Sequence, residues 1–502
     1  MTRYDHIVGG GGVGGMTAAL LLARHNRRVL LLDKAPRLGG ALARFTRQGV
    51  PFDVGFHFTG GLNPDGSGMM SDMLAVMGIR ERIEAIPLPE DKSHRVAFAD
   101  SGEIYALPNG LERCREYLRT AFPADQAGIA RYFDLFTQVC RRTASMNIRQ
   151  LDQVGERQEQ DWVSLQQVLD SLIDDPRPKA LLAVTCLCHG SKPAEISFAN
   201  HCRMTAALYD HTVRVKNGGA AFVGAFADAL RECGVEVRCS TQIAELKDVR
   251  DRKVRRFMLS DGDQVAADSC VLAIHPFSIL ELLPKRYTTP AFRHRVAEFE
   301  PSIGFFSIFG TAEGNGRAGI RENSIFSILP SPDLNRMMDP GADHPLPMVM
   351  MESEESVAGR ELRTVTAFEV SFRRQLAAWQ DTAIGRRGSQ YLAYKRERAD
   401  DMRRRLQLYH PWMEREFKLM ASASMLTFRD YLHSPFGAAY GIRQKVGQFN
   451  LFGKLPLLNL YAAGQSAMLP GVLGSMASGF FVARSMIGKT IFQKFVEDRL
   501  CH

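Results

Sequence analysis

The sequence lacks any stretch of about 18 uncharged apolar residues, the length that a helix needs to cross a bilayer. It has no internal repeat and no low-complexity linker, which excludes solenoid architectures and long disordered linkers. The chain begins directly on a strand-like run, without the charged and apolar regions of a secretory signal. We therefore expect a cytoplasmic protein.

Cysteine is sparse, with nine residues scattered over 502 positions. Cys186 and Cys188 form a C-x-C pair, but no second pair and no histidine pattern with zinc spacing accompanies it. Free or buried thiols in a reducing compartment are the better interpretation. The sequence therefore predicts no metal site.

Neither sign of charge dominates the chain. Sixty-three Lys and Arg residues are set against 55 Asp and Glu residues, which gives a net charge of +8. No nucleic-acid-binding motif accompanies this surplus, so we expect no nucleic-acid partner. Two alternatives stay open: a soluble protein with a modest basic surplus, or peripheral contact with an anionic membrane surface. No pattern in the sequence sets the oligomeric state.

The first forty residues contain a nucleotide-binding pattern. A strand-like run leads into glycines with G-x-G-x-x-G spacing, then into an apolar helix pattern and a second strand-like run that ends on an acid. In order, these parts are Tyr4 to Val8; Gly10, Gly12 and Gly15; Met16 to His25; Val29 to Leu32; and Asp33. The complete unit predicts dinucleotide binding, and a glycine-rich turn without a ligand is the alternative.

The residues of this pattern have separate physical roles. Gly10 allows the tight turn, Gly12 lets the backbone approach a pyrophosphate, and Gly15 lets the helix pack closely on the sheet. The helix N-terminus offers unpaired N–H groups and a positive dipole end to the phosphates. Asp33 can accept hydrogen bonds from a ribose 2′-OH, which suits FAD or NAD and would repel the 2′-phosphate of NADP.

Further motifs indicate which dinucleotide is bound. Arg37-Leu38-Gly39-Gly40 follows Asp33, and Phe52-Asp53-Val54-Gly55-Phe56-His57 comes soon after. Near the other end are Ala463-Gly464-Gln465 and Leu469-Pro470-Gly471. With these motifs the chain resembles the FAD-dependent phytoene desaturase, carotenoid isomerase and retinol saturase family, within the flavin amine oxidase superfamily. The resemblance covers most of the chain and is specific at its two ends.

The resemblance implies one non-covalently bound FAD and a set of residues around it. Three of them depart from the more common family pattern: Asp33 replaces Glu, Ala41 replaces Arg, and Gln465 replaces an acid. The implied cofactor-binding residues are Gly10, Gly12, Val13, Gly14, Gly15, Asp33, Lys34, Arg37, Gly39, Gly40, Ala41, Asp53, Gly55, His57, Ile243, Gly464, Gln465, Val472 and Leu473.

The expected fold is α/β, with a Rossmann-like FAD-binding domain and a discontinuous substrate domain made of an antiparallel sheet and a helical lid. The FAD-binding domain would comprise residues 1–70, 205–285 and 437–502. Helical patterns at residues 73–77, 111–120, 129–139 and 165–172 predict the lid in residues 71–204. Strand-like runs between turn signals predict the antiparallel sheet in residues 286–436.

Candidate catalytic groups are few, because flavin itself carries the redox chemistry. The resemblance puts His57 near the flavin, where it would serve as a structural hydrogen-bonding group or as an acid, base or substrate contact. Tyr440 would face the cavity or pack in the core, and Asp53 would chiefly anchor its own loop. The aromatic and methionine residues of the predicted sheet would form core, an apolar substrate tunnel, or both.

These expectations lead to an oxidoreductase that desaturates, saturates or isomerises carbon–carbon double bonds of an apolar conjugated polyene, of carotenoid or retinoid type. An alternative keeps the flavin but acts on an amine, or closes a ring in a polyene-derived natural product. A second alternative is a non-catalytic lipid-binding escort protein of the GDP-dissociation-inhibitor type. The expected partner is an apolar small molecule.

Overall fold

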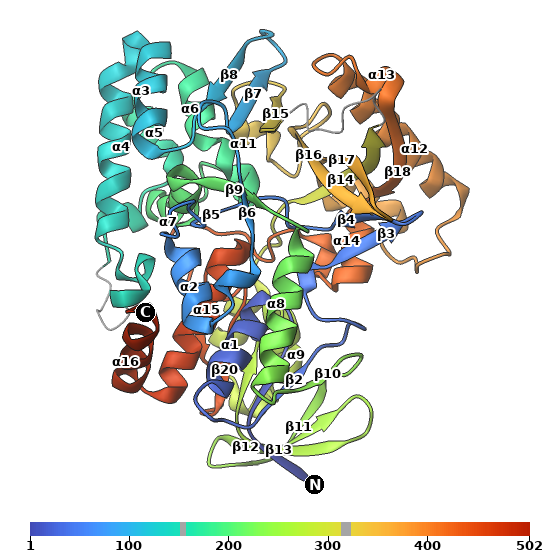
Figure 1. Cartoon of the computed structure of the whole chain (residues 1–502). Coiled ribbons are helices and arrows are strands. Elements are labelled where there is room, and N and C mark those ends of the chain that lie inside the picture. The colour runs from blue at the N-terminus through green and yellow to red at the C-terminus, as the bar shows by residue number, and fades with distance from the viewer. Residues whose placement is uncertain (151–156, 313–322, 502) are drawn as a thin grey trace.

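The computed structural model describes residues 1–150, 157–312 and 323–501. It is a mixed α/β structure built on two large sheets (Figure 1). One sheet lies with its covering helices at the lower end of the view, next to the N-terminus. The other lies in the upper part, and a helical region covers the upper left of the molecule. This arrangement confirms the predicted fold class.

The lower sheet has eight strands, in the order β10-β2-β1-β13-β12-β11, with β20 added beside β13 and β19 beside β20. The pairs β10–β2, β2–β1, β1–β13 and β13–β20 are parallel. Helices α1, α8 and α15 pack together against this sheet through an apolar core. The elements are β1 (Thr2–Gly9), β2 (Val29–Leu32), β10 (Glu236–Arg238), β11 (Ile243–Arg250), β12 (Lys253–Leu259), β13 (Gln264–Leu272), β19 (Gly453–Lys454), β20 (Leu460–Ala462), α1 (Val13–Ala23), α8 (Gly219–Glu232) and α15 (Gly471–Ile487).

The upper sheet has seven strands, in the order β18-β14-β17-β16-β15-β7-β8. Side chains alternate between its two faces, as they do along any strand. Phe306 and Met350 pack with helix α12 on one face, whereas Phe305 and Phe368 belong to the opposite face. The elements are β7 (His94–Phe98), β8 (Ile104–Leu107), β14 (Gly304–Ala312), β15 (Ile325–Leu329), β16 (Met348–Val357), β17 (Arg360–Ser371), β18 (Phe417–Ala423) and α12 (Gly388–Gln407).

The upper sheet differs from the expectation in one respect. Strands β7 and β8 come from residues 71–204, which were expected to be mostly helical, and β7 pairs with β15 in parallel. The alternation in His94–Phe98 suits a strand, and its partner lies more than 200 residues further along the chain. A parallel pair cannot be closed by a local hairpin, so sequence pattern alone does not reveal it.

Three helices of residues 71–204 lie close to predicted positions, whereas the helices at Pro176–Ala183 and Phe198–Asp210 were not predicted. The expected helices at 111–120, 129–139 and 165–172 correspond to α3, α4 and α5, which pack around a second large apolar core. No helix of the described residues is long and apolar enough to cross a membrane. The other elements are α2 (Met69–Met77), α3 (Leu111–Ala121), α4 (Gln126–Arg141), α5 (Leu165–Leu172), α6 (Pro176–Ala183), α7 (Phe198–Asp210), α9 (Pro276–Leu282), α10 (Pro290–Ala297), α11 (Leu334–Met337), α13 (Met413–Glu416), α14 (Met425–Leu432), α16 (Lys489–Leu500), β3 (Arg44–Arg47), β4 (Val50–Asp53), β5 (Thr59–Gly60), β6 (Ala85–Pro87) and β9 (Thr212–Val215).

Candidate functional site

The glycine loop connects the end of β1 to the start of α1. Gly12 is the N-cap of α1, and a Cβ atom added there would have no neighbour within 4 Å. A Cβ atom on Gly15 would instead lie 1.8 Å from the Gly10 carbonyl oxygen. Gly15 is therefore required by the packing of the turn, whereas Gly12 leaves open space in front of the helix N-terminus. That space is where the orphan N–H groups of α1 would meet an anion.

Asp33 follows β2 and binds the glycine loop directly. Its Oδ2 accepts a hydrogen bond of 2.6 Å from Gly11 N–H, and its Oδ1 accepts one of 2.7 Å from Ala35 N–H. Gly39 N–H donates to the Gly11 carbonyl oxygen at 2.9 Å, so the following loop also lies against the glycine loop. The carboxylate thus holds the loop in shape, and this role was not foreseen from the sequence. Lys34 and Arg37 are exposed beside it.

Asp53 connects the β3–β4 hairpin to the N-terminus of α8. Its Oδ1 accepts a hydrogen bond of 2.8 Å from Gly219 N–H, and Arg44 Nε lies 3.3 Å from its Oδ2. Burial raises the pKa of Asp53 to about 7, and the nearby Arg44 guanidinium opposes that rise. Arg44 also pairs with Glu355 of β16. This geometry gives Asp53 an anchoring role, which is the role favoured from the sequence.

The C-terminal motif meets the glycine loop at the carboxyl edge of the parallel strands. A Cβ atom on Gly14 would lie 2.9 Å from the Gly464 Cα atom, so the two backbones approach closely. Gly464 N–H donates to Ser478 Oγ of α15 at 2.7 Å. The Ile243 side chain lies beside Gly9 at the end of β1. The glycine loop, the C-terminal motif and Ile243 therefore meet at the carboxyl edge of the parallel strands. This edge is the usual position of a ligand in such sheets.

A cavity adjoins this edge, with an empty volume of about 1400 Å³ that includes its open mouth. One wall is the upper sheet, with Phe305, Val349 and Phe368. Other walls are helix α7, the loop from Gly55 to Gly60, and the first turn of α15. Five of the predicted site residues line the cavity: Gly55, His57, Tyr440, Val472 and Leu473. The cavity thus joins the predicted cofactor edge to the apolar face of the sheet.

The polar groups in this cavity are nearly all uncharged. Burial lowers the pKa of His57 and of His94 to about 4, and it raises the pKa of Tyr440 well above its usual value. Among the described residues, no Asp or Glu lines the cavity. Arg203, the single Lys or Arg among the described residues that line the cavity, is bound to Asp161 at 2.5 Å. At neutral pH the cavity therefore presents apolar surface and a few neutral hydrogen-bonding groups.

His57 and Tyr440 each contact an aromatic residue of the sheet wall. The His57 ring centroid lies 5.0 Å from that of Phe368, and Tyr440 meets the Phe305 ring edge-on at 6.1 Å. Tyr440 N–H donates to Ser302 Oγ at 2.9 Å, which fixes its backbone. The two candidate residues are therefore brought into one space, as their assignment to one site requires.

Sequence patterns missed the pair formed by His94 and Ser327. His94 Nε2 and Ser327 Oγ are 2.8 Å apart and both residues line the cavity. They belong to β7 and β15, so they meet only through the parallel strand pairing described above. Each of these apolar strands contains a polar residue, which could have marked it as a candidate. The sequence of one strand does not show, however, that it pairs with the other.

Buried histidines predict a fold that is sensitive to mild acid. Burial lowers the pKa of His6, His57, His94 and His275 from 6.5 to about 4. Between these values the unfolded chain binds more protons than the folded one, so stability is complete above pH 6.5 and is lost as the pH falls toward 4. Each unit by which folding shifts the pKa of one group changes the free energy of unfolding by up to about 1.4 kcal/mol. We expect the melting temperature to fall by roughly 5–15 °C between pH 7 and pH 5, measured by circular dichroism. An unchanged melting temperature over this range would contradict the prediction.

The comparisons with known proteins agree with this geometry. Residues 7–73 match the family model described as an NAD(P)-binding Rossmann-like domain. The all-trans-retinol 13,14-reductase of Macaca fascicularis is 21% identical, over 98% of this chain and 86% of its own length. The 4,4′-diapolycopene oxygenase of a Methylomonas species is 23% identical, over 59% of this chain and 60% of its own.

The fold also has close counterparts among solved structures. A triple mutant of putrescine oxidase, made to redesign its cofactor binding, superposes with a TM-score of 0.66 at 15% identity, over 97% of this chain and 99% of its own. At this identity the likeness concerns the fold. Together with the sequence relatives, it confirms the resemblance predicted above. The chain is an oxidoreductase that resembles the group containing phytoene desaturase, carotenoid isomerase and retinol saturase, and it shares the fold of putrescine oxidase.

Proposed function

We propose that the protein is an FAD-dependent oxidoreductase that acts on carbon–carbon double bonds of an apolar conjugated polyene. The observation that carries the proposal is the cavity itself, an apolar and nearly uncharged space lined by the predicted cofactor residues Gly55, Val472 and Leu473. Relatives named for retinol and diapolycopene chemistry support this substrate class. Desaturation, saturation and isomerisation all fit this cavity.

The residues at the sheet edge fit FAD. The space at Gly12 would take the pyrophosphate, with the first turn of α1 donating N–H groups to it. Gln465 and the first turn of α15 would contact the ribityl and ring region. A bound flavin supplies hydride exchange with the substrate. The protein's own contribution would be to exclude water, to hold the polyene along the sheet face, and to offer neutral donors such as His57 and Tyr440.

The amine alternative is less well supported by this cavity. A protonated amine that entered it would lose its hydration, and the described residues that line the cavity include no carboxylate to replace it. Reductive ring closure of a polyene-derived product fits the same apolar space. The alternative of a non-catalytic escort protein lacks support from the enzyme relatives.

We expect one FAD per chain, bound tightly but without a covalent bond, because residues 461–476 contain neither Cys nor His to form one. The purified protein should be yellow, and acid precipitation should release the chromophore into the supernatant. Anaerobic turnover with retinoid and carotenoid candidates, read by product mass, then tests the substrate. A colourless protein that takes up no flavin on reconstitution would refute the enzyme proposal.

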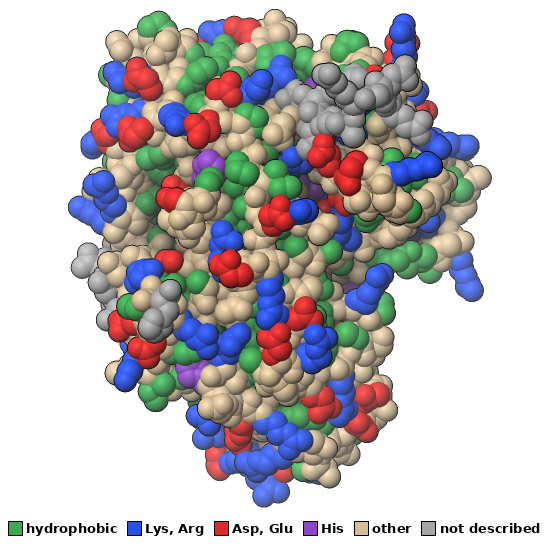
Figure 2. Space-filling model, in the orientation of Figure 1, with side chains coloured by type: hydrophobic (Ala, Val, Ile, Leu, Met, Phe, Trp, Pro, Cys, Tyr) green, Lys and Arg blue, Asp and Glu red, His purple; other side chains and the backbone are tan. Residues whose placement is uncertain are grey.

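Peripheral association with anionic membranes is a second part of the proposal. It is supported by the net charge of +8 and by the low water solubility of the proposed substrate. On the face shown in Figure 2, Lys and Arg side chains are interspersed with Asp and Glu, so a contact made by this face would depend on a few well-placed basic residues. We expect flotation with anionic liposomes at low salt, and its loss at high salt. Equal binding to neutral liposomes, or none to either, would reject an electrostatic contact.

A further inference from the structure

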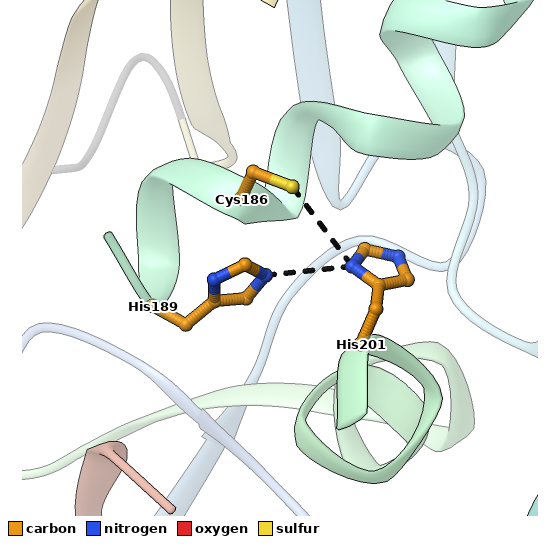
Figure 3. A group of neighbouring side chains, drawn as sticks. All are labelled: Cys186, His189 and His201. Atoms are coloured by element: carbon orange, nitrogen blue, oxygen red, sulfur yellow. Dashed lines mark hydrogen bonds between the residues drawn. The ribbon is translucent and has the colours of Figure 1, made fainter. Parts of the chain in front are cut away.

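Three buried side chains with metal-binding atoms meet beside the cavity. Cys186 belongs to the 3-10 helix η7 (Val184–Cys188), His189 follows directly, and His201 lies on α7. Figure 3 shows the three side chains pointing toward one another. Cys186 Sγ lies 4.0 Å from His201 Nδ1, and His189 Nε2 lies 3.4 Å from the same atom. All three ligand atoms lie within 4.8 Å of one another.

Two of the three separations are close to those between ligand atoms that share one metal ion. Around one tetrahedral or trigonal ion, with bonds of about 2.0 Å to nitrogen and about 2.3 Å to sulfur, ligand atoms are separated by roughly 3.3–3.8 Å. The two measured separations of 3.4 and 4.0 Å are close to this range. A thiol–imidazole contact of 4.0 Å is weak by comparison as a hydrogen bond.

Burial keeps all three groups in the uncharged form without a metal. It lowers the pKa of both histidines, that of His201 to about 3, and raises the pKa of Cys186 well above its usual value. Ser191 N–H donates to His189 Nδ1 at 3.4 Å, so the proton of the neutral ring lies on Nε2 and faces His201. If a metal bound Nε2 of His189, the ring proton would move to Nδ1. Nδ1 could then no longer accept the hydrogen bond from Ser191 N–H.

We propose that Cys186, His189 and His201 bind one thiophilic d10 metal ion, and that this ion is Cu(I). A thiolate with two imidazoles is a donor set suited to Cu(I) and Zn(II). The thiol would release its proton to solvent on binding. Thiolate and Cu(I) together carry no net charge, whereas thiolate and Zn(II) leave one positive charge in a fully buried group that contains no carboxylate. An uncompensated charge in such a site is costly, which favours the monovalent ion.

The ion would connect two elements that form the same part of the cavity wall. Leu187, Cys188 and His189 line the cavity from η7 and the turn after it, and Met204 and Thr205 line it from α7. A bond from each element to one ion would fix their separation, and with it the shape of this wall. The proposed role is structural, and it does not depend on the proposed redox function.

The test uses the full-length, untagged protein as purified, with any flavin that it carries, under anaerobic conditions. The protein is incubated with tetrakis(acetonitrile)copper(I) or with zinc sulfate, desalted, and analysed for bound metal by mass spectrometry. We expect about one copper per chain in the wild type, and at least about a 100-fold weaker affinity in Cys186→Ser and His201→Asn, since even the loss of a ligand's outer hydrogen bond costs 10–100-fold. X-ray absorption should show one sulfur neighbour of the ion.

Cys202→Ser is the matched control, because Cys202 is another buried thiol on α7 outside the cluster. It should bind copper like the wild type. Circular dichroism and flavin absorbance confirm that each variant is folded. A folded wild type that binds neither ion, or equal binding by Cys186→Ser, would overturn the site. Preference for zinc over copper in direct competition would overturn the assignment to Cu(I).

Discussion

Gly12→Val is expected to abolish FAD binding while leaving the protein folded. Gly12 has a φ of −73° and a ψ of 175°, which valine adopts readily, and a Cβ atom there meets no protein atom within 4 Å. The folded protein therefore has room for the side chain. The branched side chain would occupy the approach proposed for the pyrophosphate, whose close contact with the backbone requires glycine. Flavin absorbance after reconstitution and an unchanged far-ultraviolet spectrum are the measurements.

Gly224→Val provides the control for this experiment. Gly224 lies on α8, is exposed, and also has no neighbour within 4 Å of an added Cβ atom. It should retain full FAD occupancy, and the helix should be no less stable, because valine has a higher helix propensity than glycine. Normal FAD binding by Gly12→Val would mean that the open space at the start of α1 is not the phosphate site.

His57→Ala should slow turnover by up to about 10²–10⁴-fold, the usual range of general acid–base assistance, while FAD stays bound. His57 is neutral at physiological pH because burial lowers its pKa to about 4, and it lines the cavity. Charge that develops on a polyene is delocalised, so the reaction requires no strong base, and a neutral cavity with one or two polar donors suffices. Stopped-flow measurement of flavin reduction and reoxidation in this variant tests the expectation.

Three outcomes of this experiment assign His57 differently. Loss of both half-reactions at full FAD occupancy would make His57 an obligatory catalytic residue and would contradict the prediction. Loss of FAD would assign it to cofactor binding, and an unchanged rate would leave it a structural residue. His294→Ala is the matched control, since this histidine is exposed on α10 and its side chain contacts Glu298. It should behave as the wild type.

The parts of the fold that depend on local pattern could be predicted from the sequence. The strand, glycine loop and helix that lead to Asp33 are encoded within about thirty residues, and periodicity alone positions α3, α4 and α5. The expectation that both ends of the chain meet at the carboxyl edge of the lower sheet came from the family resemblance. Hydrophobic periodicity alone does not predict it. Of the candidate site, His57 was expected near the flavin, and Tyr440 was expected either in the cavity or in the core; both line the cavity.

Features that depend on long-range pairing could not be predicted. The β7–β15 pair joins residues far apart in sequence, and with it come His94 and Ser327. The cluster of Cys186, His189 and His201 has no recognisable spacing, because α7 returns His201 to the turn only in three dimensions. The two backbone N–H groups bound by Asp33 depend on the exact path of two loops. A periodic pattern contains no information about such partners.

The lower sheet has a consequence for the order of events during biosynthesis. Its strands come from the beginning, the middle and the end of the chain: β1 leaves the ribosome first, β13 supplies its neighbour some 260 residues later, and β20 pairs with β13 only after residue 460. Helix α1 likewise awaits α15. While the chain is being synthesised, the glycine loop therefore lacks the C-terminal segment around Gly464 that packs against it. Contacts between residues so far apart in sequence form slowly. The proposed FAD-binding edge would therefore be complete only after β20 and α15 have been synthesised.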